Sequence, residues 1–546
     1  MSAILSTLAH SSSWITFRKA IEHCLAYART QSRFELTLAA ACFLLIGAML
    51  KYPDRAIGTR ARKDVPGDRG WPLVGNLFQI LRYRDNALDF FMDQLKKHGK
   101  VYTFTLPSVG RTIQINSPEL VEYVQKTNFD NYSKSDPTGM STDVFGHGIF
   151  VSDGAEWRLQ RKTASNLFST RLFRDLVQHA FKECAHELGD NFAKYESRIT
   201  PDGQLYYFDL QQELAKMTLD AFGRIAVGIE FNAMSEEGGN EFGLAFDYMT
   251  RRIELRGVDP FWRLSEWLIF PVRRRVRRSV ETLNRYAYTA ITNRRNETPE
   301  QKENRRKDLL DYFVDYEYED GSGLTDEQLR DVFLNFLIAG RDTTSQALAW
   351  MFYHLMKHPD IEAKMREEID VVFPNGSDEY TYDIISRDMP YVKAVFYETL
   401  RLFPPVSVSG VFALGPDVLP NGTRIDAGDV VGFSSYCIGR ETDVWGPNAA
   451  EFYPDRWLQH DNHSKSPFGK FKPENAFKFN SFNGGPRICL GQQFATLEAM
   501  VTIIYILQNF QFELKPGHPT PVPMAALTTP IQGGLFVRVF KRYNNH

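Results

Sequence analysis

Apolar positions repeat with a helical period through much of the chain, and the longest such stretch precedes Pro359. Thr325 and Gln328 form a capping box at its start, which is typical of a helix N-terminus. The helical pattern then continues to Lys357 without a proline. The pattern therefore predicts a single helix of about 32 residues and roughly 48 Å, long enough to cross a whole domain.

Two further segments have strong helical patterns. The first has Pro390 at an early helical position and ends at two consecutive prolines, residues 404–405. The second begins near Leu490 and places Phe494 and Leu497 on one apolar face. These helical patterns indicate a mainly α fold, and the family resemblance given below implies small β-sheets beside the helices.

The N-terminal region carries an apolar stretch with basic flanks. Residues 36–50 contain one polar residue, Thr37, and basic residues precede and follow them. Fifteen residues are fewer than the roughly twenty that usually span a bilayer, but snorkelling of basic side chains extends a short span. We expect a transmembrane anchor over residues 34–51, with the cytosol on its C-terminal side because the larger basic cluster follows it. A buried core helix is the alternative.

Two different segments flank this anchor. Residues 1–33 contain an amphipathic stripe that either lies in the membrane interface as a helix or frays. Residues 52–75 are rich in proline, glycine and basic residues and are predicted to form a hinge. No low-complexity tract or second linker follows, so residues 65–546 are predicted to form one domain.

Composition and cysteine spacing exclude several classes of protein. The 64 basic and 67 acidic residues give a net charge of −3, so the bulk charge does not indicate a nucleic-acid partner. The five cysteines are scattered and none forms a CxxC pair, which argues against a disulfide framework and against a zinc site. This cysteine pattern is typical of a reducing compartment.

One cysteine lies in a setting that suits iron. Cys489 follows a glycine-rich turn, two residues after Arg487, at the start of a predicted helix. A thiolate binds iron well, and a helix N-terminus favours the thiolate form. Gly485 and Gly491 allow the backbone to approach a flat cofactor, and Arg487 can pair with a haem propionate. The alternative is an ordinary buried cysteine.

The middle of the long helix carries a second candidate site. Gly340 weakens the helix there, and two β-branched residues, Thr343 and Thr344, follow it. Weak points of this kind often mark helical bulges and functional sites. Asp342 and Thr343 place a carboxylate beside a hydroxyl, a pair that can relay protons to bound dioxygen. The alternative is a surface aspartate and a threonine bonded back to its own helix.

Two side-chain pairs at helical spacing complete the candidate residues. Trp157 and Arg161, at i and i+4, can face one propionate together. Glu398 and Arg401, at i and i+3, would by themselves be an ordinary surface ion pair. Arg456 supplies another arginine downstream.

These motifs, in this order, resemble the cytochrome P450 family over about residues 71–540. The resemblance implies the fold of that family and haem b as the cofactor, with the Cys489 thiolate as the iron ligand. Asp342 and Thr343 then correspond to the family's oxygen-activating acid–alcohol pair. The implied cofactor-binding residues are Trp157, Arg161, Ala339, Gly340, Phe482, Gly485, Arg487, Cys489 and Gly491. The implied structural network behind the haem loop consists of Glu398, Arg401 and Arg456.

The resemblance also implies a function. It indicates a monooxygenase that hydroxylates a hydrophobic substrate with dioxygen and two electrons. Residues 339–344 and 487–495 are most similar to fungal alkane and fatty-acid hydroxylases, so we expect a long-chain fatty acid, an alkane or a lipophilic secondary metabolite as substrate. A haem-thiolate isomerase or dehydratase and a non-catalytic haem-binding membrane protein are the alternatives, and the Asp342–Thr343 pair disfavours both.

The expected partners follow from the same resemblance. Electrons are expected from a separate NADPH–cytochrome P450 reductase, with cytochrome b5 as a second donor, at the endoplasmic reticulum membrane. Basic residues near the Cys489 loop suit an acidic partner surface: Lys470, Lys472, Lys478, Arg158 and Lys162. Membrane lipid is a further expected partner. Residues 261–270 are rich in apolar and aromatic side chains and five arginines follow, so this segment either dips into the membrane or begins a helix with a solvated charged face.

One segment departs from the fatty-acid hydroxylase pattern. In that subgroup the strand after the double proline usually carries arginines, whereas residues 406–412 contain none. One propionate partner is therefore missing or supplied by another part of the chain. Because this strand lines the substrate pocket in the family, a substrate other than an ordinary fatty acid is also compatible with the departure.

Overall fold

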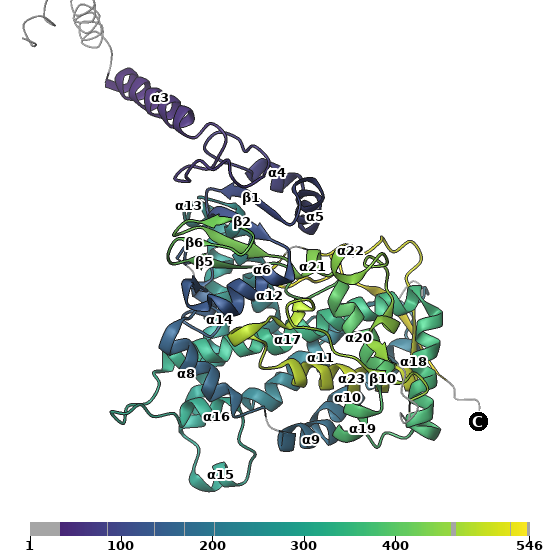
Figure 1. Cartoon of the computed structure of the whole chain (residues 1–546). Helices are drawn as coiled ribbons and strands as arrows, with labels where there is room; N and C mark the ends of the chain where they lie inside the picture. Colours follow the sequence, from purple (N-terminus) through teal and green to yellow (C-terminus); the bar gives the residue numbers. More distant parts are fainter. Residues whose placement is uncertain are drawn as a thin grey trace, which may run out of the picture.

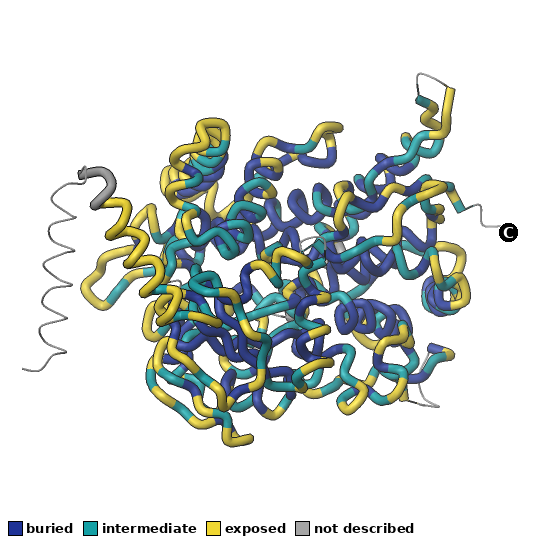
Figure 2. The backbone as a smooth tube through the Cα atoms, turned by 90° about the horizontal axis from the view of Figure 1, so that it is seen from above, coloured by how far each residue is buried: buried dark blue, intermediate teal, exposed yellow. Residues whose placement is uncertain are grey.

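The N-terminal apolar stretch forms a helix that projects from the rest of the protein. The computed structural model describes residues 33–83, 86–135, 137–168, 170–200, 203–459, 466–524 and 526–542, so the amphipathic stripe predicted within residues 1–33 lies outside the described residues. Helix α3 (Arg33–Lys51) leads away from the sheet region, and its described side chains are mostly exposed (Figures 1 and 2). A membrane crossing was expected over residues 34–51, whereas no helix in the described part of the chain combines the length and apolarity that a crossing needs.

Helices make up most of the described residues, which confirms the predicted mainly α fold with small sheets. After α3 the helices are α4 (Leu77–Arg82), α5 (Ala87–His98), α6 (Pro118–Glu122), α7 (Thr142–Phe145), α8 (Gly154–Ser165), α9 (Thr170–Gln178), α10 (Ala180–Glu196), α11 (Leu210–Phe222), α12 (Glu241–Val258), α13 (Trp262–Leu268), α14 (Phe270–Arg295), α15 (Pro299–Glu303), α16 (Leu309–Val314), α17 (Asp326–Lys357), α18 (Pro359–Val372), α19 (Tyr382–Arg387), α20 (Pro390–Leu402), α21 (Ser435–Ile438), α22 (Thr442–Trp445) and α23 (Gln492–Asn509).

The strands form one sheet of five strands and three smaller sheets. The five-stranded sheet has the order β1 (Val101–Leu106), β2 (Gly110–Ile115), β8 (Val430–Phe433), β5 (Ser409–Ala413), β3 (Tyr132–Ser133). Its pairs are antiparallel except for β2 with β8. The smaller sheets pair β11 (Phe510–Leu514), β12 (Phe536–Lys541) and β4 (Phe208–Asp209); β9 (Leu458–Gln459) and β10 (Lys470–Phe471); β6 (Asp417–Val418) and β7 (Arg424–Ile425).

The segment predicted as a hinge, residues 52–75, packs on the five-stranded sheet. Ala56 is fully buried, and its backbone N–H donates to Thr105 Oγ1 of β1 at 3.0 Å. Gly75 has a positive φ and lies against Thr105, where a Cβ would overlap the threonine. These contacts fix the segment to the sheet over part of its length.

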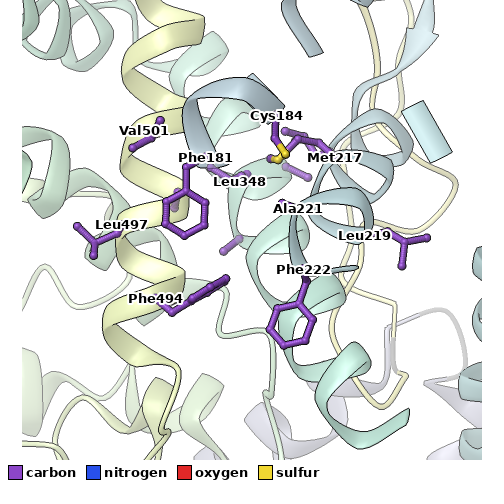
Figure 3. Packing of buried hydrophobic residues seen from close by; sticks show 14 of the residues in the cluster. Phe181, Cys184, Met217, Leu219, Ala221, Phe222, Leu348, Phe494, Leu497 and Val501 are labelled. Carbon is purple, nitrogen blue, oxygen red and sulfur yellow. The ribbon is translucent and has the colours of Figure 1, made fainter. Parts of the chain in front are cut away.

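Helix α17 forms with the predicted bounds and lies at the centre of the fold (Figure 1). Its capping box is complete: Thr325 Oγ1 accepts from the Gln328 N–H at 3.2 Å, and Gln328 Oε1 accepts from the Thr325 N–H at 3.0 Å. Figure 3 shows Leu348 of α17 among side chains of α10, α11 and α23, which include Phe181, Phe222 and Phe494. This apolar core encloses the candidate site described below.

The expected weak point at Gly340 does not interrupt the helix. Helix α17 continues through Gly340 with no π-bulge. The ring of Phe222 from α11 lies where a Cβ on Gly340 would be. Glycine is therefore needed here for close packing of two helices, and this packing keeps the helix regular despite the low propensity of glycine.

Candidate active site

The loop before α23 holds Cys489 through backbone geometry. The Cys489 N–H donates to the Phe482 carbonyl at 2.8 Å, which closes the loop. Asn483 and Gly485 both have positive φ, and a Cβ on Gly485 would overlap the Gln125 carbonyl. The turn and the Gln125 carbonyl thus both require glycine at position 485, and its approach to a flat cofactor stays a prediction.

The Cys489 thiol has accessible surface, although the surrounding protein shields it from bulk water. Its side chain is exposed, and yet burial raises the pKa of the thiol. Both observations hold if the thiol faces an internal space that protein encloses. The backbone N–H of Gly491 and the charge of Arg161 act in the opposite direction on this pKa, because both favour the thiolate.

Helix α17 is not fully buried at two positions one turn apart. Between Leu329 and Phe352 every residue is buried except Ala339 and Thr343. These two lie at i and i+4 and so share one face of the helix. The Thr343 hydroxyl donates to the Ala339 carbonyl at 2.8 Å, which leaves its oxygen lone pairs directed away from the helix. Contact of Ala339 and Gly340 with a cofactor stays a prediction.

Asp342 and Thr343 are neighbours in sequence but do not hydrogen-bond to each other. The Asp342 carboxylate is buried and accepts from Arg341 Nη1 at 2.9 Å, whereas Thr343 is partly exposed. Burial raises the pKa of Asp342, and the adjacent Arg341 guanidinium opposes this. The acid and the alcohol therefore point to different surroundings, and a proton passing between them needs an intermediary.

The predicted propionate partners come together from two distant segments. Trp157 and Arg161 lie on α8, and the Arg161 guanidinium is 5.8 Å from the Trp157 ring. Arg487 of the Cys489 loop also lies against Trp157, and its guanidinium is 4.6 Å from the same ring. Burial lowers the pKa of both arginines.

Lys134 joins this group, although the sequence analysis did not identify it. Its Nζ donates to Ser409 Oγ at 2.6 Å. Ser409 begins β5, the strand that lacks the arginine usual in the fatty-acid hydroxylases, so Lys134 supplies a cation beside that strand. Burial and the nearby Arg487 charge lower the pKa of Lys134 to about 8. We call Lys134, Arg161 and Arg487 the cationic cluster.

The cationic cluster is short of negative charge. Among the described residues, its only ion pair is Arg487 Nη2 with Asp153 Oδ1 at 2.6 Å. Asp153 precedes α8 and also accepts from the backbone N–H of Lys134 at 3.1 Å. The buried Arg487 Nε has no partner in the described part of the chain. Three cations thus share one carboxylate, and the two uncompensated charges fit the two propionates of haem b.

A second group of buried charges is fully satisfied. Glu398 Oε2 accepts from Arg401 Nε at 2.8 Å, and Glu398 Oε1 accepts from Arg456 Nε at 3.0 Å. The Trp457 indole and the Tyr453 N–H also donate to this carboxylate. We call Glu398, Arg401 and Arg456 the Glu398 network. The structure brings the three together as the sequence predicted, and its role in haem incorporation stays a prediction.

A groove reaches the Cys489 loop from the protein surface. It has a volume of about 680 Å³, and Phe482, Ile488 and Gln492 of the loop region line it together with Arg387, Lys393 and Lys470. Two of the other basic residues expected nearby, Lys472 and Lys478, lie within 3.8 and 3.1 Å of Glu474, which also lines the groove. The groove lining therefore combines apolar side chains of the loop with three basic residues and two acidic ones, Asp383 and Glu474.

Comparison with known proteins gives a consistent result over nearly the whole chain. The Cytochrome P450 family model matches residues 65–536. The cytochrome P450 monooxygenase cyp1 of Mycosarcoma maydis is 35% identical over 517 residues, which cover 90% of this chain and 78% of that protein. Cytochrome P450 94C1 of Arabidopsis thaliana is 33% identical, with 84% and 90% covered. The alkane hydroxylase MAH1 of Arabidopsis thaliana is 30% identical, with 87% and 93% covered.

Proposed function

The chain belongs to the cytochrome P450 family and is a cytochrome P450 monooxygenase, and we propose that it hydroxylates a long apolar molecule, such as a fatty acid, an alkane or a lipophilic metabolite. The similarity to an alkane hydroxylase supports this substrate class. The observation that carries the proposal is the exposed Cys489 thiol, whose pKa burial nevertheless raises, together with three partly buried cations, Lys134, Arg161 and Arg487.

Haem b fits the residues present in this space. Cys489 would ligate the iron, and the cationic cluster with Trp157 would hold the propionates. When bound, a haem with a thiolate ligand supplies the electron density that favours O–O cleavage. The Gly491 N–H near the sulfur stabilises negative charge on Cys489, which keeps the ligand in its thiolate form.

Two residues of α17, Asp342 and Thr343, would bind and transfer protons during the reaction. Thr343 is partly exposed, and its hydroxyl oxygen can accept a hydrogen bond beside α17, since its single proton is donated to the Ala339 carbonyl and its lone pairs are not used by the helix. Asp342 is the nearby ionisable group, and its raised pKa brings it closer to neutral pH, where a carboxyl can take up and release a proton.

Electrons would enter at the groove beside the Cys489 loop. A separate NADPH-dependent flavoprotein, with cytochrome b5 as a second donor, would dock there with acidic side chains against Arg387, Lys393 and Lys470. Phe482 and Ile488 of the Cys489 loop line the groove, so a partner docked there would lie beside the loop that carries the proposed iron ligand.

Membrane lipid would be a further partner, at the endoplasmic reticulum. The described apolar side chains of α3 are largely exposed, and so are Phe261, Trp267 and Phe270 around α13. Exposed apolar patches of this kind mark interaction surfaces. Arginines at the start of α14 lie next to the second patch, as expected for contact with anionic headgroups.

The substitution Cys489→Ser tests the haem-thiolate assignment. The reduced, carbon-monoxide-bound wild-type protein should show the Soret band typical of a thiolate ligand, and the variant should lose this band because a serine oxygen cannot replace the soft ligand. Cys437→Ser is a control, since Cys437 is buried within the fold. A thiolate band that persists in Cys489→Ser would overturn the assignment.

The substitution Thr343→Ala tests proton handling. With reductase present, the variant should still consume NADPH but release peroxide in place of product, lowering product formation by roughly 10²–10⁴-fold, the usual contribution of positioned acid–base groups. Thr502→Ala is the control, because Thr502 likewise donates to its own helix, at Glu498, but on α23. Unchanged product per NADPH in Thr343→Ala would show that the hydroxyl is dispensable.

A further inference from the structure

One arginine nitrogen joins the buried acid of α17 to an exposed acid on another helix. Arg341 Nη1 lies 2.9 Å from Asp342 Oδ1 and 2.5 Å from Asp247 Oδ1 of α12. The side chains of Arg341 and Asp342 are 8% and 9% exposed, whereas that of Asp247 is 56% exposed. A buried carboxylate therefore shares its counter-ion with a carboxylate in contact with solvent.

The surroundings hold Arg341 in this bridging position. Thr218 of α11 donates its hydroxyl to the Arg341 carbonyl at 2.9 Å. Gly243, one turn before Asp247 on α12, lies beside the guanidinium, where a Cβ would be 3.6 Å from Nη2. Arg341 Nε is buried without a partner in the described part of the chain, and the guanidinium donates hydrogen bonds to the two carboxylates through Nη1.

Few charged groups act on Asp342. Arg341 lies on the same helix and Asp247 on α12, and the Thr218 hydroxyl of α11 donates to the Arg341 carbonyl rather than to the Asp342 carboxylate. The buried Glu498 of α23 interacts with Thr344 rather than with Asp342. The state of Asp342 therefore depends mainly on how Arg341 divides its charge between two carboxylates.

Arg341 cannot itself relay a proton, because a guanidinium stays protonated in proteins. It can only hold negative charge in place. Arg341 lowers the pKa of Asp342, and the negative charge of Asp247 raises it. Since both carboxylates contact Arg341 Nη1, the attraction between Arg341 and the Asp342 carboxylate is weaker when Asp247 also binds that nitrogen.

We propose that Asp247 is a positioning residue for Asp342: by sharing Arg341 Nη1, it keeps the buried carboxylate loosely held and able to take up a proton. The proposal rests on the proposed role of Asp342 in proton handling. Because Asp247 lies on α12 and Asp342 on α17, the position of α12 sets how tightly Asp342 is held. Proton supply at the active site is thereby coupled to the placement of α12.

The test is the ratio of product formed to NADPH consumed, measured against pH with the holoenzyme, reductase and a medium-chain or long-chain fatty acid or alkane that the wild-type protein turns over. This ratio should fall as rising pH deprotonates Asp342. In Asp247→Asn the fall should occur at lower pH, by roughly one unit, since removing a like charge lowers the pKa of a carboxyl. Asp247→Glu should restore the wild-type profile.

Glu241→Gln is a matched control. Glu241 lies on the same helix, its side chain is 62% exposed, and it pairs with Arg285 at 2.6 Å, but that arginine belongs to α14. This variant loses the same charge and an arginine pair without touching Arg341, so its pH profile should match wild type. The carbon-monoxide spectrum of each variant verifies that haem is held normally.

A double variant separates the two hypotheses. Asp342→Asn should flatten the pH profile, and Asp247→Asn should add nothing in that background if it acts through Asp342. If Asp342→Asn keeps the wild-type profile, the proposed role of Asp342 is wrong. If Asp342→Asn flattens the profile while Asp247→Asn behaves like Glu241→Gln, the role of Asp342 stands and the positioning role of Asp247 is overturned.

Discussion

Two buried arginine sites in this protein differ in how completely the protein satisfies them. In the Glu398 network, the Arg401 guanidinium is bound by Glu398 and by backbone carbonyls that include Ala449 and Glu451. Its side chain and that of Glu398 have no exposed surface. In the cationic cluster, Arg161 makes no hydrogen bond or ion pair with the described residues. Both sites have more cations than acids, so charge counting alone does not distinguish them.

The difference lies in the hydrogen bonds. No nitrogen or carboxylate oxygen of the Glu398 network is left buried without a partner, whereas Arg487 Nε of the cationic cluster is. A buried cation without a partner is costly, so a protein retains one only where something else completes it. We therefore expect the satisfied site to stabilise the fold, and we propose that an anionic group of the cofactor completes the unsatisfied site.

The largest effect is expected from Glu398→Gln. This change removes the one negative charge between Arg401 and Arg456 in a site with almost no solvent. Breaking a buried pair by removing one partner costs about 3–5 kcal/mol, so the variant should unfold at much lower denaturant concentration and yield little holoprotein. Urea unfolding followed by fluorescence and by the Soret band measures this.

A surface pair provides the matched control for Glu398→Gln. Glu122 and Lys126 lie 2.8 Å apart at i and i+4, and both side chains are exposed. Exposed pairs contribute at most about 1 kcal/mol, so Glu122→Gln should change unfolding little. If Glu398→Gln and Glu122→Gln were equally stable, the distinction between the two arginine sites would have no energetic basis.

Arg161→Gln should differ from Glu398→Gln, because it should weaken haem binding without destabilising the haem-free protein. Because Arg161 has no acidic partner among the described residues, its loss should leave the haem-free protein as stable as before, or more stable. The holoprotein should release haem about 10–100-fold faster, since a hydrogen bond to a charged group contributes about 1.5–3 kcal/mol. Transfer of haem to apomyoglobin measures the rate. Arg158→Gln, an exposed arginine on the same helix, should release haem like wild type.

The contrast between these sites also shows what the sequence could predict. Helix α17, its cap and the order of the motifs were predicted because capping and periodicity are local patterns. The Glu398 network was predicted through a family resemblance, since an ion pair at i and i+3 says nothing by itself about burial. The structure supplies the missing information, which is that the carbonyls of a distant segment close around Arg401.

Other residues were missed because their partners are far away in sequence. Lys134 and Ser409 are 275 positions apart, and Asp247 and Arg341 are 94 apart. The sequence signalled only that residues 406–412 lack an arginine. The sequence also did not show that neighbouring groups require two of the glycines, Gly340 beside the Phe222 ring and Gly485 beside the Gln125 carbonyl. Packing of this kind has no local signature.

The smallest effect is expected from Lys134→Met, and its pH dependence sharpens the comparison. Lysine offers a compact point charge rather than a fork, so haem release should accelerate by about tenfold or less. In the haem-free protein, burial and Arg487 lower the pKa of Lys134 from 10.5 to about 8. Between these values the unfolded chain binds more protons than the folded protein does.

Stability of the haem-free protein should therefore rise with pH across that window, because stability rises wherever the unfolded state holds more protons. Lys134→Met removes the titrating group, so the difference in unfolding free energy between wild type and variant should shrink as the pH rises from about 8 to 10.5. Urea unfolding at several pH values measures this difference. A difference that stayed constant would mean that Lys134 has the same pKa in the folded and unfolded protein, and Lys134 would then not count as an uncompensated cation of the cluster.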